Sequence, residues 1–130
     1  MIVVDDRKLV SHLGSRYPVP VEVAPFGWQV TARELLDLGA KPVLRRNPDD
    51  EPFIGDGGHK ILDCAFGQIA SAESLARKLD HVVGLVEHGL FIGMTPEVRV
   101  AGASGVRVLK EPTPDVNRSA AYLATMPANR

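Results

Sequence analysis

The sequence predicts an α+β fold built around one β-α-β-β-α-β unit, and three observations indicate it. Between Val19 and Gly93, apolar stretches typical of strands alternate with two stretches whose apolar residues recur at helical spacing. Turns rich in glycine, proline and acidic residues separate these stretches. Two further strand-like pieces, 1–6 and 98–109, flank the unit without helices of their own. These flanks suggest that the chain begins partway through a larger domain.

The strands of the unit are predicted from β-branched and alternating apolar residues. In the first strand, from Val19 to Ala24, valines alternate with Pro20 and Glu22, and Pro25 ends the strand. The remaining strands are expected over 41–46, over 53–54 and 59–66 on either side of the turn 56–58, and over 85–92.

Two clear helices are predicted in the unit. The first runs from Gly27 to Leu38, and the second, with Ser71 as its N-cap, runs from Ala72 to about His81. The apolar side of the first helix is expected to hold Trp28, Ala32, Leu35 and Leu36. Two helices on one face of a four-stranded antiparallel sheet form the ferredoxin-like arrangement. A short helix over 8–13, ended by Gly14, is also expected ahead of the unit.

The flanking strands lack an obvious cover. The continuous apolar run from Met1 to Val4 is typical of a strand covered on both faces, and 98–109 reads as a hairpin around the turn 102–105. Both clear helices belong to the ferredoxin-like unit, so the tail or another polypeptide is expected to cover the first strand. The tail, 111–130, is expected to be flexible, with a short helix over 120–126.

Composition sets the class of protein. The chain has 130 residues, of which 45% are apolar and 24% charged, as in an ordinary soluble globular protein. The net charge of −1 and the pI near 6.4 give no reason to expect nucleic-acid or membrane partners. No apolar run approaches the ~20 residues that span a bilayer. No secretory signal follows Met1, so a cytoplasmic location is expected.

Few residues suggest chemistry by their pattern alone. The four histidines show no spacing that places two on one helix face, so neither a metal nor another cofactor is expected. Cys64, the only cysteine, and His88 lie in apolar strands, which favours burial over reactivity. The turn 102–105 lies between two strands and favours a hairpin over a phosphate-binding loop. The charged pairs 45–46 and 49–50, with Glu51, are expected to be exposed.

The end of the first strand is the exception. Asp5 and Asp6 close an apolar strand at the place where α/β sheets commonly carry ligand-binding groups. Lys8 follows two residues later, and as a compact cation it could reach a phosphate or a sugar oxygen. From the pattern alone, a solvated loop remains the alternative.

Several segments, taken together and in order over about residues 2 to 110, resemble type A ribose-5-phosphate isomerase. They are VVDDRKLV (3–10), VPVEVAPF (19–26), AREL (32–35), LGAKP (38–42), DGGHKILD (56–63), GLVEHGLF (84–91) and GVRVL (105–109). The turn 55–59 departs from the family's usual Asp-Asn-Gly-Asn, although Gly57 keeps the turn shape accessible.

The resemblance implies a two-part protein. A Rossmann-like α/β domain, of which 1–17 and 97–110 would be a remnant, carries catalysis, and a ferredoxin-like domain, 18–96, is inserted into it and contributes to subunit association. The family interconverts ribose 5-phosphate and ribulose 5-phosphate in the pentose phosphate pathway, without a metal, through an enediol. A carboxylate moves the proton between the two carbons, while a lysine and backbone amides hold the substrate.

The match covers only the C-terminal part of the family's chain. The phosphate loop, the acidic signature and the catalytic glutamate of the family all precede the strand at Ile2, so no catalytic residue carries over. Of the substrate-contacting positions, only one does, onto Lys8. The resemblance therefore implies a substrate-binding role for Lys8 and negligible activity of the chain alone, with the sugar phosphates bound if the missing half is supplied.

Two other hypotheses stay open at this point. The chain could be a non-catalytic ferredoxin-like module that forms a homo-oligomer. By fold analogy alone, it could also be a regulatory domain that binds a small molecule.

Overall fold

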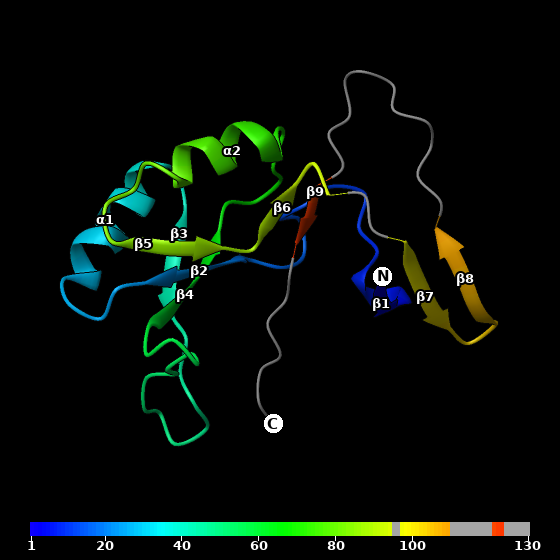
Figure 1. The fold of residues 1–130 in the computed structure, drawn as a ribbon, viewed down its shortest axis with the longest axis horizontal. Helices are drawn as coiled ribbons and strands as arrows, with labels where there is room; N and C mark the ends of the chain where they lie inside the picture. The colour runs from blue at the N-terminus through cyan, green and yellow to red at the C-terminus, as the bar shows by residue number, and fades with distance from the viewer. Residues whose placement is uncertain (95–96, 110–120, 124–130) are drawn as a thin grey trace.

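The computed structural model describes residues 1–94, 97–109 and 121–123, and it has a mixed α/β fold with two helices and three sheets. Figure 1 shows one sheet with both helices on the left and a second sheet on the right. No helix in these described ranges has the length and apolar character needed to cross a membrane. In chain order the elements are β1 (Ile2–Asp5), the 3-10 turn η1 (Asp6–Lys8), β2 (Val19–Val23), α1 (Trp28–Asp37), β3 (Lys41–Leu44), β4 (Lys60–Ala65), α2 (Ala72–Leu79), β5 (Leu85–His88), β6 (Leu90–Ile92), β7 (Val98–Gly102), β8 (Gly105–Leu109) and β9 (Ala121–Leu123).

The larger sheet has the strand order β3-β4-β2-β5, and its neighbours are all antiparallel. Both helices contribute to the core that covers one face of this sheet. The valines of β2 are fully buried there, as the alternating pattern predicts, because every second side chain of a strand points to the same face. The buried core cluster consists of Val19, Val21, Val23, Leu35, Ala40, Leu62, Cys64, Ala76, Leu79, Val82 and Leu90.

The two predicted helices are present, with two corrections. In α1 the predicted Leu36 is exposed, and Thr31 is buried in its place. Thr31 can be buried because its hydroxyl donates a hydrogen bond to the carbonyl oxygen of Val83 at 2.9 Å. The second helix ends at Leu79 rather than His81, and its predicted N-cap, Ser71, accepts a hydrogen bond from the amide of Ser74.

The smaller sheet joins the two flanking pieces of the sequence. Its order is β1-β7-β8: β1 runs parallel to β7, with Ile2 opposite Val98 and Asp5 opposite Ala101. β7 and β8 form the predicted hairpin. The parallel pairing brings the end of β1 next to the β7–β8 turn, which lies about a hundred residues later in the sequence.

Three other expectations differ from the structure. The predicted strand over 85–92 breaks at Gly89 into β5 and β6, which belong to different sheets; the amide of Gly89 donates to the carbonyl oxygen of Pro20. The helix expected over 8–13 is wrong, because η1 forms earlier and Leu9 is extended. Within the helix expected over 120–126, Ala121–Leu123 is a strand that pairs with β6. The rest of the tail lies outside the described residues.

Candidate functional site

The predicted site lies at the carboxyl end of β1, where Asp5 begins the turn η1. Its carboxylate accepts a hydrogen bond from the backbone amide of Arg7 at 3.0 Å and pairs with the Arg7 guanidinium at 2.9 Å. The Arg7 hydrogen bond, more than any other contact, lowers the pKa of Asp5 below its ordinary value. Asp5 therefore stays an ionised carboxylate bound to Arg7, and it lacks the near-neutral pKa that suits a general base.

Lys8 ends η1 and is half-buried against an aromatic ring. Its ammonium nitrogen lies 4.4 Å from the centroid of the Tyr17 ring, within cation–π range. The Tyr17 hydroxyl donates a hydrogen bond to the carbonyl oxygen of Arg7 at 3.1 Å, and Arg16 donates to the same oxygen. The folded chain thus gathers Arg7, Lys8 and Arg16 around Tyr17. We call these four residues the basic cluster; its cations suit an anionic ligand such as a phosphate.

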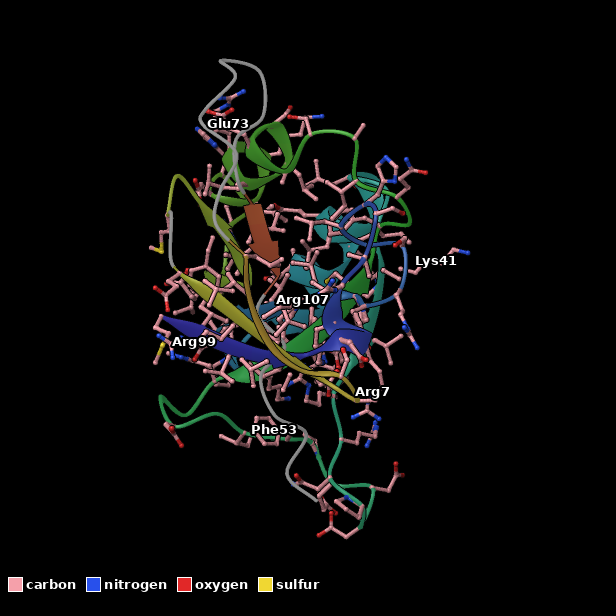
Figure 2. The ribbon with its side chains drawn as sticks, turned by 90° about the vertical axis from the view of Figure 1, so that its right-hand side faces the viewer. Arg7, Lys41, Phe53, Glu73, Arg99 and Arg107 are labelled. Atoms are coloured by element: carbon pink, nitrogen blue, oxygen red, sulfur yellow. The ribbon has the colours of Figure 1, made fainter. Side chains whose placement is uncertain are left out.

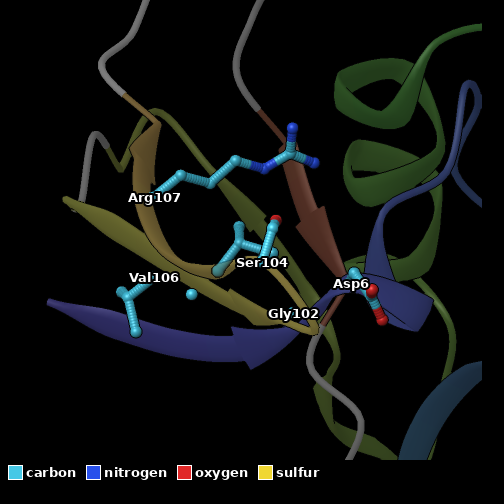
Figure 3. Close-up of a pocket in the computed structure, with 7 residues that line it drawn as sticks. Asp6, Gly102, Ser104, Val106 and Arg107 are labelled. Atoms are coloured by element: carbon cyan, nitrogen blue, oxygen red, sulfur yellow. The ribbon is translucent and has the colours of Figure 1, made fainter.

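The sequence pattern did not indicate the residues that meet Asp6. Asp6 lines a pocket of about 220 Å³ together with the β7–β8 turn (Figure 3). Gly102 permits this approach, because a Cβ atom there would lie 3.1 Å from a carboxylate oxygen of Asp6. The lining residues are Asp6, Val100, Gly102, Ser104, Gly105, Val106 and Arg107. The turn is a hairpin turn, as predicted, and it contributes Ser104 to the pocket lining, while β8 contributes Arg107.

Cys64 is not placed for chemistry. It is fully buried in the core cluster, and its thiol lies 3.7 Å from the carbonyl oxygen of Leu62. Burial raises the pKa of the Cys64 thiol from 9.0 to about 12, with a smaller contribution from the charge of Asp63. Because the thiolate is the nucleophile, a thiol with this pKa is inert near neutral pH.

The histidines have local partners. His88 uses both ring nitrogens: Nδ1 accepts from the amide of Leu90, so Nε2 carries the proton and donates it to Asp80 at 3.1 Å. The Nδ1 atom of His59 lies 2.7 Å from a carboxylate oxygen of Glu22. Within the described residues, no group of three or more histidine, cysteine or acidic side chains is placed to hold a metal ion.

Arg45 corrects the prediction that the 45–46 pair is exposed. Its guanidinium forms two hydrogen bonds with the carboxylate of Asp63, and its side chain is only 14% exposed. The Phe53 ring lies beside it, with its centroid 5.8 Å from the guanidinium carbon. Figure 2 draws and labels the Phe53 side chain. Arg46 pairs with Asp50 and is exposed, as predicted.

Comparison with known proteins identifies the class of this chain. It is 49% identical over 111 residues to ribose-5-phosphate isomerase A of Synechococcus sp., covering 85% of this chain and 48% of that protein. It is 53% identical over 109 residues to the Gloeobacter violaceus protein of the same name, covering 84% and 47%. The solved structure of ribose 5-phosphate isomerase A from Methanocaldococcus jannaschii matches with a TM-score of 0.75 and 35% identity, over 84% of this chain and 48% of that one. The fold is therefore the α/β fold of a part of these isomerases.

The family match gives the particular assignment. Residues 1–105 match the family described as ribose 5-phosphate isomerase A (phosphoriboisomerase A). The chain belongs to the ribose 5-phosphate isomerase A family, which confirms the resemblance seen in the sequence. It spans about half the length of the curated relatives it matches.

Proposed function

We propose that this chain is the C-terminal half of a ribose-5-phosphate isomerase and that Lys8 holds the sugar phosphate. The complete protein interconverts ribose 5-phosphate and ribulose 5-phosphate. One observation carries the proposal: in a segment that matches the family, Lys8 stands in a basic cluster at the carboxyl end of a parallel strand. This is the edge at which α/β sheets bind ligands.

The division of chemical roles follows from the groups at this edge. An aldose–ketose interconversion through an enediol needs a base that removes a proton from one carbon and returns it to the next. Asp5 does not fit this role, because Arg7 holds it as a carboxylate of lowered pKa. We therefore assign proton transfer to a carboxylate of the half that this chain does not span, and substrate binding to Lys8. On this proposal the chain alone has negligible isomerase activity.

We also propose a division into two domains and a cytoplasmic location. Residues 1–17 and 97–110 would belong to a Rossmann-like domain, and 18–96 would be a ferredoxin-like domain inserted between them. Support comes from the two separate sheets, since β1 pairs with β7 across the whole intervening unit. Further support comes from the strand order β3-β4-β2-β5 with two helices packed against its core face.

The experiment joins this chain to the part of the Synechococcus isomerase that precedes its matched segment and measures isomerisation of ribose 5-phosphate. The fusion should turn over substrate and the isolated chain should not. Lys8→Ala in the fusion should lower kcat/KM about 10- to 100-fold, the range expected for losing one charged hydrogen bond. Lys41→Ala is the matched control, because Lys41 is an exposed lysine of β3, in the other sheet (Figure 2). A folded but inactive fusion, or turnover by the chain alone, contradicts the proposal.

A second candidate function is association without catalysis, as a homo-oligomer. It is favoured by large apolar side chains exposed on the proposed ferredoxin-like domain, among them Phe26, Val43 and Val83. Light scattering after sizing chromatography of the isolated chain tests it. A uniform oligomer supports association, and a monomer at every concentration excludes it.

A further inference from the structure

Lys8 is held against the ring of Tyr17, which comes later in the chain. The ammonium nitrogen lies 4.4 Å from the ring centroid, whereas the guanidinium carbon of Arg16 lies 5.8 Å from it. Lys8 and Tyr17 are both half-buried, so part of the water around the ammonium is excluded. A cation–π contact is stronger when its cation is desolvated. The ring therefore restricts the long side chain of Lys8 from one side.

The hydroxyl and the backbone of Tyr17 fix its ring. The hydroxyl donates a hydrogen bond to the carbonyl oxygen of Arg7 at 3.1 Å, so the ring is tied to the turn η1 that carries Lys8. The backbone of Tyr17 lies just before β2, whose first residue, Val19, is fully buried and pairs with Cys64 of β4. The ring is thus anchored both to η1 and to the larger sheet.

The loop between η1 and Tyr17 also has a defined path. The amide of Ile69 donates a hydrogen bond to the carbonyl oxygen of Leu13 at 2.9 Å, and both side chains pack against the core cluster. Gly14 has positive φ, and the carbonyl oxygen of Gly67 leaves no room for a Cβ atom there. These contacts attach the loop to the larger sheet before it returns to η1.

We propose that Tyr17 is a positioning residue whose ring holds the Lys8 ammonium in place for the anionic substrate. The inference rests on the proposed function for the role of Lys8. A lysine has a flexible four-carbon stem, and ordering it on binding costs conformational entropy. A ring that holds the ammonium before the substrate arrives removes part of this cost. Because an ammonium donates in three directions, its contact with the ring is compatible with donation to a phosphate or sugar oxygen.

The first test measures the contact directly, by NMR of the chain labelled with carbon-13 lysine. The Lys8 signal is assigned by its absence in Lys8→Arg. Protons above the face of an aromatic ring are shifted upfield, so the Lys8 Cε protons should be shifted upfield in the native chain and in Tyr17→Phe, and should lose this shift in Tyr17→Leu. Lys60, whose ammonium lies 5.0 Å from the centroid of the Trp28 ring, is the internal control and should keep its shift in each variant. An unshifted Lys8 in the native chain overturns the inference without any variant.

The second test is a double-mutant cycle in the fusion with the preceding part of the Synechococcus isomerase. Tyr17→Leu should lower kcat/KM about fivefold, the size expected for a half-buried cation–π contact, and Tyr17→Phe should stay within about twofold because it keeps the ring. In the Lys8→Ala background, Tyr17→Leu should lower kcat/KM by no more than about twofold, since it acts through Lys8. Phe53→Leu is the matched control, because it also removes a ring beside a cation, Arg45, at the end of β3, and it should leave kcat/KM unchanged.

The outcomes separate this inference from the proposed function. Non-additive losses, together with an upfield-shifted Lys8, support the positioning role of Tyr17. Additive losses of Tyr17→Leu and Lys8→Ala overturn it, because they assign Tyr17 to packing of the loop alone. Equal losses in Tyr17→Phe and Tyr17→Leu also overturn it, since the hydroxyl rather than the ring would then be the cause. An inactive fusion, or an unchanged kcat/KM in Lys8→Ala, counts against the proposed function, and the NMR shift of Lys8 then decides the inference on its own.

Discussion

Raising the pH should destabilise the chain through one buried thiol. Cys64 is fully buried in the core cluster, and folding raises its pKa from 9.0 to about 12. An acid whose pKa is raised in the folded state keeps its proton there, while the unfolded chain releases it above pH 9. The contribution of Cys64 to the free energy of unfolding is therefore complete below pH 9 and is lost as the pH rises from 9 toward 12.

The size of the effect follows from these two pKa values. Between them, stability falls by about 1.4 kcal/mol per pH unit, so the Cys64 contribution should drop by about 2 kcal/mol between pH 8 and pH 10.5. This is measurable against the roughly 5–15 kcal/mol that stabilise a typical domain. Urea unfolding of the native chain and of Cys64→Ala at both pH values is the assay, since lysines and tyrosines titrate in both proteins and cancel in the difference.

The difference between the two proteins is the decisive quantity. Cys64→Ala leaves a small cavity whose cost does not depend on pH, so it lowers the free energy of unfolding of the variant by the same amount at every pH. The free energy of unfolding of the native chain, relative to Cys64→Ala, should fall as the pH rises. Parallel pH dependences, or rapid alkylation of the native thiol by iodoacetamide at pH 9.5, would refute the reasoning, because either would mean that Cys64 reaches solvent without unfolding.

Two further substitutions test the packing of the larger sheet. Asp63→Asn should lower the free energy of unfolding in urea by about 2–3 kcal/mol, which is below the range for a fully buried pair because the Arg45 and Asp63 side chains are 14% and 27% exposed. The double variant Arg45→Met with Asp63→Leu should recover most of this stability. An unchanged urea midpoint for Asp63→Asn would show that the pair is solvated. Gly84→Ala should destabilise the chain more than Gly39→Ala. Both glycines have positive φ, but only at Gly84 would the new Cβ lie 2.5 Å from the Thr31 hydroxyl oxygen. Equal shifts in the thermal midpoint of the two variants would show that this clash does not contribute to the loss of stability.

The sequence predicts those parts of the fold that depend on local patterns. Alternating valines predict β2 and its buried face, and Ser71 predicts the start of α2, because burial period and helix capping are properties of a few neighbouring residues. It fails where distant contacts decide. The strand break at Gly89 depends on the carbonyl of Pro20, and the burial of Thr31 depends on the carbonyl of Val83. Neither partner is visible in a local pattern.

The candidate site divides in the same way. Lys8 is a candidate that the sequence alone suggests, because it follows a strand whose acidic end is a local signal, and its binding role stays a prediction. That Ser104 and Arg107 line one pocket with Asp6 could not be predicted, since it requires the parallel pairing of β1 with β7. That pairing closes over an entire intervening unit, and its register depends on packing between segments far apart in the chain.

On the proposed function, the charge at the end of β1 explains why this chain is suited to binding rather than to proton transfer. Arg7 lowers the pKa of Asp5 and holds it ionised, and the basic cluster around Tyr17 adds positive charge that favours anions. A general base that works near pH 7 needs a raised pKa, and burial away from cations raises the pKa of a carboxyl group. A protein that must hold a sugar phosphate and move its proton therefore gains from placing the two tasks on different segments. In this chain the described groups at the end of β1 supply the first environment.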